Sequence, residues 1–383
     1  MAAFKAIIVG LFFAIFIYIT HQLVRHADLS IGQALFVVGF VATLFAIVIS
    51  MPLFFWSRSE ARSTPKPWHD PYFSAAHFSM AYMSFLLSFV ILRDLVGFIL
   101  NFTQPEFVGT QLYSAQATGI LLVVPFILLL LGTLVVRLGA KVIKLNVQFD
   151  KLPSGLNNLR IVHVTDLHLA AGLPVNFVRN LVSKINQLDA DIVVFTGDIL
   201  DDHAIRHLPE FDLLKTVRAK HGCYFVAGNH EYYWNIDEGL AAFRSIGYHV
   251  LVNQTETLEI NGATLQISGI ADPAARQFGK EPADLEKLVS EQKPEAFKIF
   301  LAHQPAIADK ACDKGFDLQL SGHTHGGQFF PWNFLIVFFQ RYPKGLYRIK
   351  NMQLYVNQGT GYWGPSLRLG TFCELTEITL KKA

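Results

Sequence analysis

Five short blocks in the second half of the chain carry side chains that could perform chemistry. Each block follows an apolar run typical of a buried strand, as at residues 161–164. In chain order the blocks supply Asp166 and His168, Asp198 and Asp201, Asn229 and His230, His303, and His323 and His325. Because open α/β sheets gather their chemistry at the carboxyl ends of strands, we expect these side chains to converge.

The residue types in these blocks predict a metal centre. Aspartate, asparagine and histidine without cysteine form a moderately hard ligand set, suited to Mn, Fe, Zn, Co or Mg rather than to a structural zinc cage. Seven candidate ligands need two ions, and they are Asp166, His168, Asp198, Asn229, His303, His323 and His325. Two cations about 3.5 to 4 Å apart clamp a phosphate ester and acidify a shared water. The predicted reaction is hydrolysis at phosphorus.

Strands and helices must alternate to position these blocks. Helices are expected at residues 176–188, 211–219 and 238–245, and strands at residues 161–164, 191–195, 224–227, 249–252, 256–260 and 264–270. The last apolar runs, 345–349, 353–356 and 374–380, are expected to form a second sheet packed on the first. The pattern predicts an α/β fold with mixed sheets. A polar connection at residues 144–155 would precede it, with the domain boundary near residue 145, giving domains 1–145 and 146–383.

The blocks DLH, GDILD, GNHE, AHQP and GHTHGGQ, in this order, resemble those of the calcineurin-like metallophosphoesterases, in particular a bacterial membrane-anchored subgroup. The resemblance covers about residues 158–381 and implies a four-layered α/β/β/α sandwich. It also implies two divalent ions, with Mn²⁺ expected first and Fe, Zn, Co or Mg as alternatives. One ion would be held by Asp166, His168 and His325, and the other by Asn229, His303 and His323, with Asp198 bridging both.

The same resemblance assigns a catalytic role to His230. Its side chain would stabilise the transition state or protonate the leaving oxygen, and Asp201 would orient it. An alternative for Asp201 is a cap on the following helix, a common role of aspartate. Five other histidines are interpreted as structural residues: His163, His203, His207, His221 and His249.

A glycine-rich segment, NQGTGYWGPSLRLG, lies near the end of the chain. It contains G-x-G-x-x-G, but Pro365 follows directly and no βαβ unit surrounds it, so we reject a dinucleotide site. The segment resembles a carboxyl-terminal loop that borders the active site in the membrane-linked subgroup. Arg368 would then contact a substrate phosphate, or alternatively form a structural salt bridge.

The composition indicates a membrane protein. Of 383 residues, 52% are hydrophobic and 16% charged, which is too apolar for an ordinary soluble protein of this size. The net charge of +2, without a dense basic stripe, gives no reason to expect a nucleic-acid partner. Three widely spaced cysteines argue against a disulfide scaffold.

Four apolar runs before residue 145 predict about four transmembrane helices, at residues 6–20, 31–55, 72–92 and 117–136. The first run would also suit a signal peptide, but no small-x-small cleavage site follows it. Cations cluster at the amino terminus and in alternate loops, which four spans place on one side of the membrane: Lys5, then Arg58, Arg62 and Lys66, then Arg137, Lys141 and Lys144. By the positive-inside rule the amino terminus and everything after residue 137 face the cytoplasm, at the inner membrane of a bacterium. The charged pair Arg93 and Asp94 is expected to mark the end of the third span, with residues 95–102 in the interface.

An apolar run at residues 329–339, FFPWNFLIVFF, directly follows the last ligand block. It is too short to cross a bilayer. One interpretation is a buried core helix or strand. The other is an apolar flap beside the metals that faces the membrane interface and receives acyl or isoprenoid chains, with Arg341 and Lys344 suited to anionic headgroups.

These features predict an integral membrane phosphohydrolase with a dinuclear metal centre. Its substrate would be a membrane lipid or lipid-linked phosphate, cleaved at a phosphoester or pyrophosphate bond. The resemblance to bacterial family members that cleave UDP-diacylglucosamine implies that compound as the specific expectation. One alternative is a membrane-tethered phosphodiesterase that acts on soluble substrates. Another is a non-catalytic membrane sensor of a phosphorylated ligand.

Overall fold

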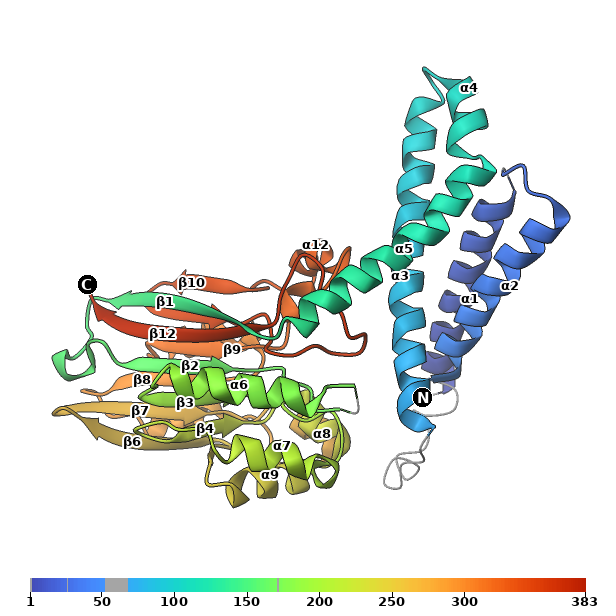
Figure 1. The fold of residues 1–383 in the computed structure, drawn as a ribbon. Coiled ribbons are helices and arrows are strands. Elements are labelled where there is room, and N and C mark those ends of the chain that lie inside the picture. The colour runs from blue at the N-terminus through green and yellow to red at the C-terminus, as the bar shows by residue number, and fades with distance from the viewer. Residues whose placement is uncertain (1, 26, 52–67, 171) are drawn as a thin grey trace. The chain divides into compact units, whose positions relative to one another are not determined.

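The computed structural model describes residues 2–25, 27–51, 68–170 and 172–383 (Figure 1). The chain divides into two compact units. A helical unit comprises Met1–Leu134 with the short segment Gly364–Leu367, and a sheet unit comprises Val135–Trp363 with Arg368–Ala383. The boundary that the sequence predicts near residue 145 falls inside strand β1 of the sheet unit.

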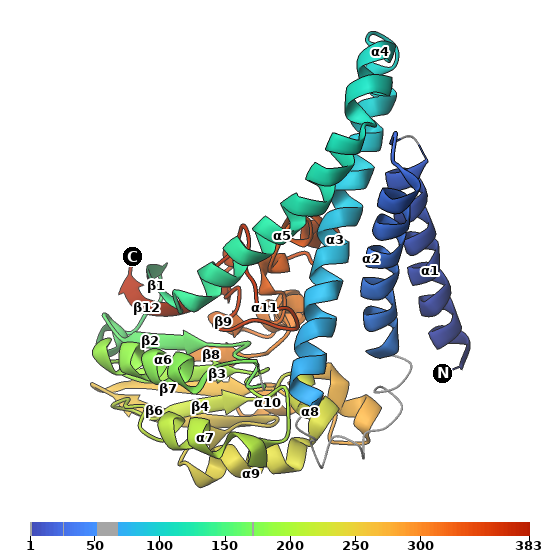
Figure 2. The same cartoon turned by 45° about the vertical axis from the view of Figure 1, so that its right-hand side comes forward.

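The helical unit is built from long apolar helices (Figure 2). They are α1 (Ala2–Val24), α2 (Ile31–Ser50), α3 (His69–Leu100) and α5 (Ala115–Arg137), with the short α4 (Pro105–Phe107) and a π-helical turn, Val108–Leu112, before α5. A capping box begins α2, because the Ser30 hydroxyl accepts from the Gln33 amide and the Gln33 side chain accepts from the Ser30 amide.

Three helices among the described residues are long and apolar enough to cross a membrane: α2, α3 and α5, with mean hydropathies of 2.3, 2.0 and 2.9. Three of the four predicted spans are therefore present as helices of suitable length. In α1 the apolar stretch Val9–Val24 is shorter, so the predicted span at residues 6–20 stays a prediction. The end of the predicted span 31–55 and the cations Arg58, Arg62 and Lys66 lie outside the described residues.

Helix α3 continues through Arg93 and Asp94 to Leu100, so the charged pair does not end the helix, and the end of the membrane span at this pair stays a prediction. Arg93 is only 6% exposed, and its Nη2 lies 2.9 Å from Asp94 Oδ1 and donates to the Gln22 carbonyl at 2.9 Å. The Tyr18 hydroxyl donates to Asp94 Oδ2 at 2.7 Å. These partners stabilise both charges within the helical unit, so the helix need not stop where the charges occur. The network also links α1 to α3.

Replacing Arg93 with alanine is expected to lower the free energy of unfolding of the helical unit by about 3 kcal/mol. The reason is that the variant leaves the partly buried Asp94 carboxylate beside Tyr18 without its cation. Unfolding of the full chain by SDS titration in mixed micelles would measure the change. Arg25, which is exposed on the same unit, provides the matched control as Arg25→Ala. Equal unfolding of Arg93→Ala and the wild type would show that the pair does not stabilise the unit.

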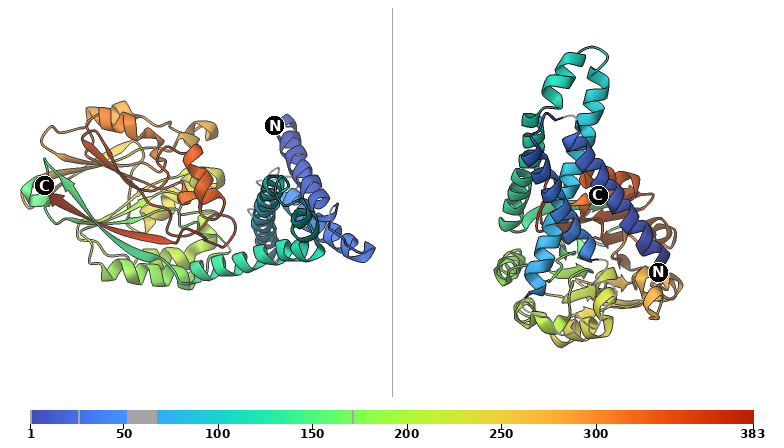
Figure 3. Two further views of the ribbon diagram at one scale, coloured as in Figure 1. Left: turned by 90° about the horizontal axis from the view of Figure 1, so that it is seen from above. Right: turned by 90° about the vertical axis from the view of Figure 1, so that its right-hand side faces the viewer.

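Over the described residues the sheet unit contains two six-stranded sheets (Figures 1 and 3). The first has the order β1 (Lys141–Phe149), β12 (Glu374–Lys382), β2 (Arg160–Val164), β3 (Ile192–Thr196), β4 (Cys223–Val226) and β5 (His249–Val250). The second has the order β10 (Gly345–Ile349), β11 (Met352–Val356), β9 (Leu318–Ser321), β8 (Phe297–Leu301), β7 (Ala263–Gly269) and β6 (Gln254–Ile260). Strands β2, β3 and β4 are parallel, as are β7, β8 and β9.

Three apolar cores among the described residues of the sheet unit show the order of its layers. One core packs α6 (Val175–Gln187), α7 (Leu208–Leu214) and α9 (Ile236–Ser245) on the outer face of the first sheet (Figure 2). A second core lies between the sheets and joins side chains such as Ile192 and Ile299. The third packs α10 (Leu285–Ser290) and α11 (Ala308–Asp313) on the outer face of the second sheet. The predicted α/β/β/α sandwich is confirmed.

Two details of the predicted sheets are wrong. Residues 144–155 are not all connection, since β1 runs to Phe149 and pairs in parallel with β12. Strand β12 joins the first sheet between β1 and β2, whereas the sequence grouped it with β10 and β11 in the second. Alternate burial in β1, with Val147 and Phe149 inside, is the local signal that marks the strand. Which sheet takes β12 depends on long-range pairing, which its own residues do not encode.

Candidate metal centre

All seven predicted ligands follow the carboxyl ends of parallel strands. Asp166 and His168 follow β2, Asp198 follows β3, and Asn229 begins α8 (Asn229–Trp234) just after β4. His303 follows β8, and His323 and His325 follow β9, so both sheets contribute ligands. The hydrogen bond from the His323 amide to Asp166 Oδ1, at 3.0 Å, directly joins the block after β9 to the block after β2.

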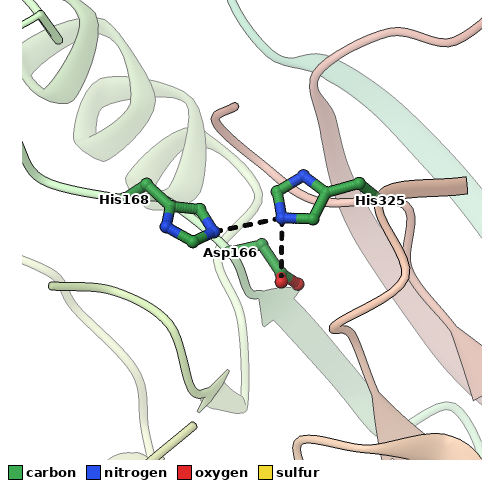
Figure 4. Close-up of side chains that lie close together, drawn as sticks. All are labelled: Asp166, His168 and His325. Atoms are coloured by element: carbon green, nitrogen blue, oxygen red, sulfur yellow. Dashed lines mark hydrogen bonds and ion pairs between the residues drawn. The ribbon is translucent and has the colours of Figure 1, made fainter. Parts of the chain in front are cut away.

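The first cluster consists of Asp166, His168 and His325 (Figure 4). His325 Nε2 lies 3.0 Å from His168 Nε2 and 3.3 Å from Asp166 Oδ1. All three residues are buried. Two imidazole nitrogens and a carboxylate oxygen that point at one another offer three ligand atoms to a single cation.

The second cluster consists of Asp198, His303 and His323. His303 Nε2 lies 3.1 Å from Asp198 Oδ2 and 3.2 Å from His323 Nδ1. The other ring nitrogen of His303, Nδ1, lies 2.8 Å from the Thr196 carbonyl. A proton on Nδ1 makes that bond and leaves Nε2 as a metal ligand, the usual support for a ligating histidine.

Asp198 and Asn229 complete the arrangement. Asp198 Oδ2 lies 4.0 Å from His168 Nε2 in the first cluster as well as 3.1 Å from His303 Nε2 in the second. The Asn229 Oδ1 atom is buried without a hydrogen-bond partner among the described residues, which costs about 1–3 kcal/mol unless a cation binds it. The residues therefore fit two divalent ions with Asp198 between them. The assignment of each ligand to an ion stays a prediction.

His230 lies beside this centre and contacts Asp201. His230 Nδ1 is 2.7 Å from Asp201 Oδ1, which also accepts from Trp234 Nε1 at 3.1 Å. Burial alone lowers the pKa of His230, but the carboxylates of Asp198 and Asp201 outweigh it and raise the pKa to about 9. His230 Nε2 lies 3.9 Å from Asp198 Oδ2, so a protonated ring faces the metal ligands. This geometry favours the orienting role of Asp201 over the helix cap.

Most of the predicted ligands have a strained backbone. Positive φ angles occur at Asp166, His168, Asp198, His323 and His325, at 51°, 52°, 52°, 73° and 52°. Non-glycine residues rarely adopt this left-handed conformation, and it persists where the surroundings impose it. The strain turns each side chain toward the site immediately after its strand ends. No signal in the sequence revealed it.

Glu231 is a positioning residue that the sequence reasoning missed. Its Oε1 accepts from the backbone amides of Ile199 and Leu200 at 2.7 and 2.9 Å. Its Oε2 accepts from the amides of Gly228 and Asp198 at 2.7 and 2.9 Å. One buried carboxylate thus clamps the loop after β3 to the loop after β4. Its place inside the GNHE block is the only local signal for this role.

Arg368 contacts His325, a member of the first cluster. Its guanidinium is 0% exposed and donates to the carbonyls of Gly361 and Gly359 at 2.9 and 3.1 Å. Its Nη1 donates to the His325 carbonyl at 3.3 Å, and its Nη2 lies 3.3 Å from His325 Nδ1. Arg368 therefore supports a predicted ligand in this structure, and its contact with a substrate phosphate stays a prediction.

The five histidines interpreted as structural lie outside both clusters. His163, for example, is buried with Nε2 2.7 Å from the Thr196 hydroxyl, and burial lowers its pKa to about 3. His203 and His249 contact carboxylates of Glu238 and Glu256 at 3.1 and 2.8 Å. His207 lies between acidic neighbours, and His221 is partly exposed.

The apolar run at residues 329–339 is not a buried core element, so that interpretation is wrong. It forms α12 (Trp332–Leu335) and a 3₁₀ turn, Ile336–Phe338. Phe338 and Phe339 are 78% and 74% exposed. The run begins beside the last ligand block: a Cβ on Gly327 would come within 2.3 Å of the Trp332 carbonyl oxygen.

Comparison with known proteins matches residues 159–327 to the family model described as calcineurin-like phosphoesterase. All seven predicted ligands fall within this range. An uncharacterized metallophosphoesterase from Campylobacter jejuni is 36% identical over 233 residues, 60% of this chain and 61% of that protein. An uncharacterized metallophosphoesterase from Helicobacter pylori (strain ATCC 700392 / 26695) is 31% identical over 308 residues, 78% of this chain and 80% of that protein.

Another similar protein is named as a transmembrane protein. The "transmembrane protein with metallophosphoesterase domain" from Danio rerio is 32% identical over 279 residues, 70% of this chain and 64% of that protein. The chain thus spans less than two thirds of the length of this relative and of the Campylobacter protein.

Proposed function

The chain belongs to the calcineurin-like metallophosphoesterases, a family of metal-dependent phosphoester hydrolases with a dinuclear centre, and we propose that it cleaves a phosphoester or pyrophosphate bond in a lipid-linked substrate. The observation that carries the hydrolytic part is the convergence of two ligand clusters on Asp198. When bound, two divalent cations polarise the phosphoryl oxygens and acidify an attacking water. We propose Mn²⁺ as the first choice for both positions: the two carboxylates and the Asn229 amide oxygen suit it, and the four histidines also accept Fe or Zn.

The protein side chains hold and move the proton of the leaving group. Asp201 accepts from His230 Nδ1 and so fixes the orientation of the ring. The raised pKa of His230 keeps a proton at Nε2 near neutral pH. In a phosphoester, a leaving oxygen near Nε2 would receive this proton as its bond to phosphorus breaks, which avoids the release of an unstable alkoxide; cleavage of a pyrophosphate releases a phosphate, which needs the proton less. Asp198 holds His230 in place by accepting from its backbone amide at 2.8 Å.

Exposed aromatic rings around His230 support an apolar leaving group. The ring centroid of His230 lies 5.1 Å from that of Tyr233 and 5.9 Å from that of Trp363, and Phe278 lies 5.9 Å from Tyr233. All three aromatic residues are about half exposed. Gln328 fixes Trp363 by two hydrogen bonds of 2.9 Å with its backbone. Aromatic rings beside the proton donor favour a substrate with an apolar group, such as a nucleotide-linked lipid like UDP-diacylglucosamine.

The apolar helices and the membrane-protein relative indicate association with a membrane. We place the protein in the inner membrane of a bacterium, with the metal centre on the cytoplasmic side. The support is the cationic cluster at the end of α5 and in the following β1, namely Arg137, Lys141 and Lys144.

The full chain reconstituted in nanodiscs with Mn²⁺ would test the substrate class. We expect kcat/KM for UDP-diacylglucosamine or another pyrophosphate-linked lipid to exceed that for bis(p-nitrophenyl) phosphate. Truncation of the aromatic group by Phe278→Ala is expected to lower lipid turnover by about tenfold, the value of roughly one lost apolar contact. Ile205→Ala, which removes an exposed apolar side chain that belongs to neither ligand cluster nor the aromatic group, should change neither rate. Turnover of the soluble diester alone would instead support the membrane-tethered phosphodiesterase.

A further inference from the structure

The segment that follows the last ligand block ends in an exposed apolar tip. The tip consists of Trp332, Phe334, Leu335, Val337, Phe338 and Phe339, all exposed in the structure. Soluble surfaces seldom expose so many large apolar side chains in one continuous stretch, and such patches mark interaction sites.

The base of the tip is ordered by hydrogen bonds. The Asn333 amide donates to the Phe329 carbonyl at 3.0 Å, and the Thr324 hydroxyl donates to the Pro343 carbonyl. Tyr342 is buried, and its hydroxyl donates to Asp309 at 3.1 Å. Both ends of the segment are therefore attached near the metal ligands His323 and His325. The apolar side chains are held outward by a defined base rather than by a loose loop.

A short linker ties the sheet unit, which carries the tip, to the apolar helix α5. Helix α5 has a mean hydropathy of 2.9, and only residues 138–140 separate it from β1 of the sheet unit. Three extended residues span at most about 10 Å. If α5 crosses a bilayer, as proposed, the sheet unit is held at the bilayer surface at all times.

The residues beside the tip favour lipid over a protein partner. Arg341 is exposed, although Asp309 lies 2.7 Å from its guanidinium, and Lys344 is exposed three residues further on. Aromatic and aliphatic side chains flanked by cations are typical of segments that lie in the headgroup region of an anionic membrane.

We propose that this apolar tip inserts into the lipid bilayer and so fixes the metal centre at the membrane surface. The inference rests on the membrane association in the proposed function. It adds a second attachment besides the helices and assigns a partner, the bilayer itself, to residues that no ligand assignment uses. A lipid-linked phosphate would then meet the ligands without leaving the interface.

Site-specific fluorescence tests this proposal without any turnover. Phe338→Cys, labelled with the polarity-sensitive dye NBD, would be compared with Ile205→Cys, because Ile205 is also apolar and 71% exposed but lies away from the tip. Both variants are made in the full chain with Cys312→Ser, since Cys223 and Cys373 are buried. Retained hydrolysis of bis(p-nitrophenyl) phosphate by each would show that the labelled chain is folded.

In nanodiscs of anionic phospholipid, we expect the dye at residue 338 to shift to the blue and to lose at least half of its emission when the acyl chains are brominated. The dye at residue 205 should keep its aqueous spectrum and intensity. Equal, water-like spectra at both positions would overturn the proposal. A blue shift at residue 338 without quenching by bromine would also overturn it, because a second copy of the chain and not lipid would then cover the tip. Since the readout is quenching, its failure is separate from any failure of lipid hydrolysis.

Discussion

Replacing Asp198 with asparagine is expected to lower kcat for phosphoester hydrolysis by about a thousandfold or more. Asp198 Oδ2 lies between the two ligand clusters, 3.1 Å from His303 Nε2 and 4.0 Å from His168 Nε2. An amide carries no negative charge, so it cannot offset the repulsion between two neighbouring cations. The loss of several kcal/mol of transition-state stabilisation corresponds to this factor, since each 1.36 kcal/mol is tenfold in rate.

The measurement is the rate of bis(p-nitrophenyl) phosphate hydrolysis together with metal content by mass spectrometry. We expect bound metal to fall from two ions per chain to one or fewer. The matched control is Asp212→Asn, which changes an exposed aspartate on α7. An Asp198→Asn protein that retains two ions and normal turnover would contradict the bridging role and would require another residue between the clusters.

Replacing His230 with asparagine is expected to lower kcat by about 10²- to 10⁴-fold on substrates with an alkyl leaving group, as for loss of a general acid. The effect should be much smaller with a p-nitrophenyl leaving group, which needs no proton. Asp198 and Asp201 raise the pKa of His230 to about 9, so the protonated form is present at neutral pH and is lost as the pH rises through that pKa. The wild-type rate on alkyl substrates should therefore fall at alkaline pH, and this fall should vanish in the variant.

Metal content must stay at two ions per chain in His230→Asn, because His230 belongs to neither predicted ligand set. His221→Asn, at a partly exposed histidine away from the clusters, provides the control. If His230→Asn slows alkyl and nitrophenyl substrates equally, proton donation is not its role. His230 would then act in substrate binding, with Asp201 holding its ring in place for that purpose.

The layers of the fold could be predicted from local patterns, but the sheet membership could not. Short continuous apolar runs and amphipathic helical patterns identify most strands and helices between residues 160 and 320. The insertion of β12 between β1 and β2 joins residues more than 200 positions apart. A strand that is buried on both faces fits the interior of either sheet equally well, so its own residues give no preference.

The exposed tip and Arg368 show a similar limit. By residue type alone, the apolar tip would be expected inside the protein and the charged arginine at its surface, but the structure shows the reverse. The apolar residues Phe338 and Phe339 lie outside, and the charged Arg368 lies fully inside. Carbonyl oxygens of Gly359 and Gly361 satisfy the guanidinium, and such backbone partners depend on tertiary approach rather than on sequence type.

The sequence by itself determined which chemistry is available: seven oxygen and nitrogen ligands, a histidine with a carboxylate partner, and apolar helices in the same chain. These follow from residue type, which fixes charge, ligand atoms and hydrophobicity before folding. Only the tertiary structure decided how the ligands meet. Strands from the two sheets converge at one edge. This convergence imposes the left-handed backbone at Asp166, Asp198 and His325, and it lets Glu231 accept hydrogen bonds from four backbone amides. Steric and hydrogen-bond constraints between distant segments impose that geometry, and local sequence cannot specify it.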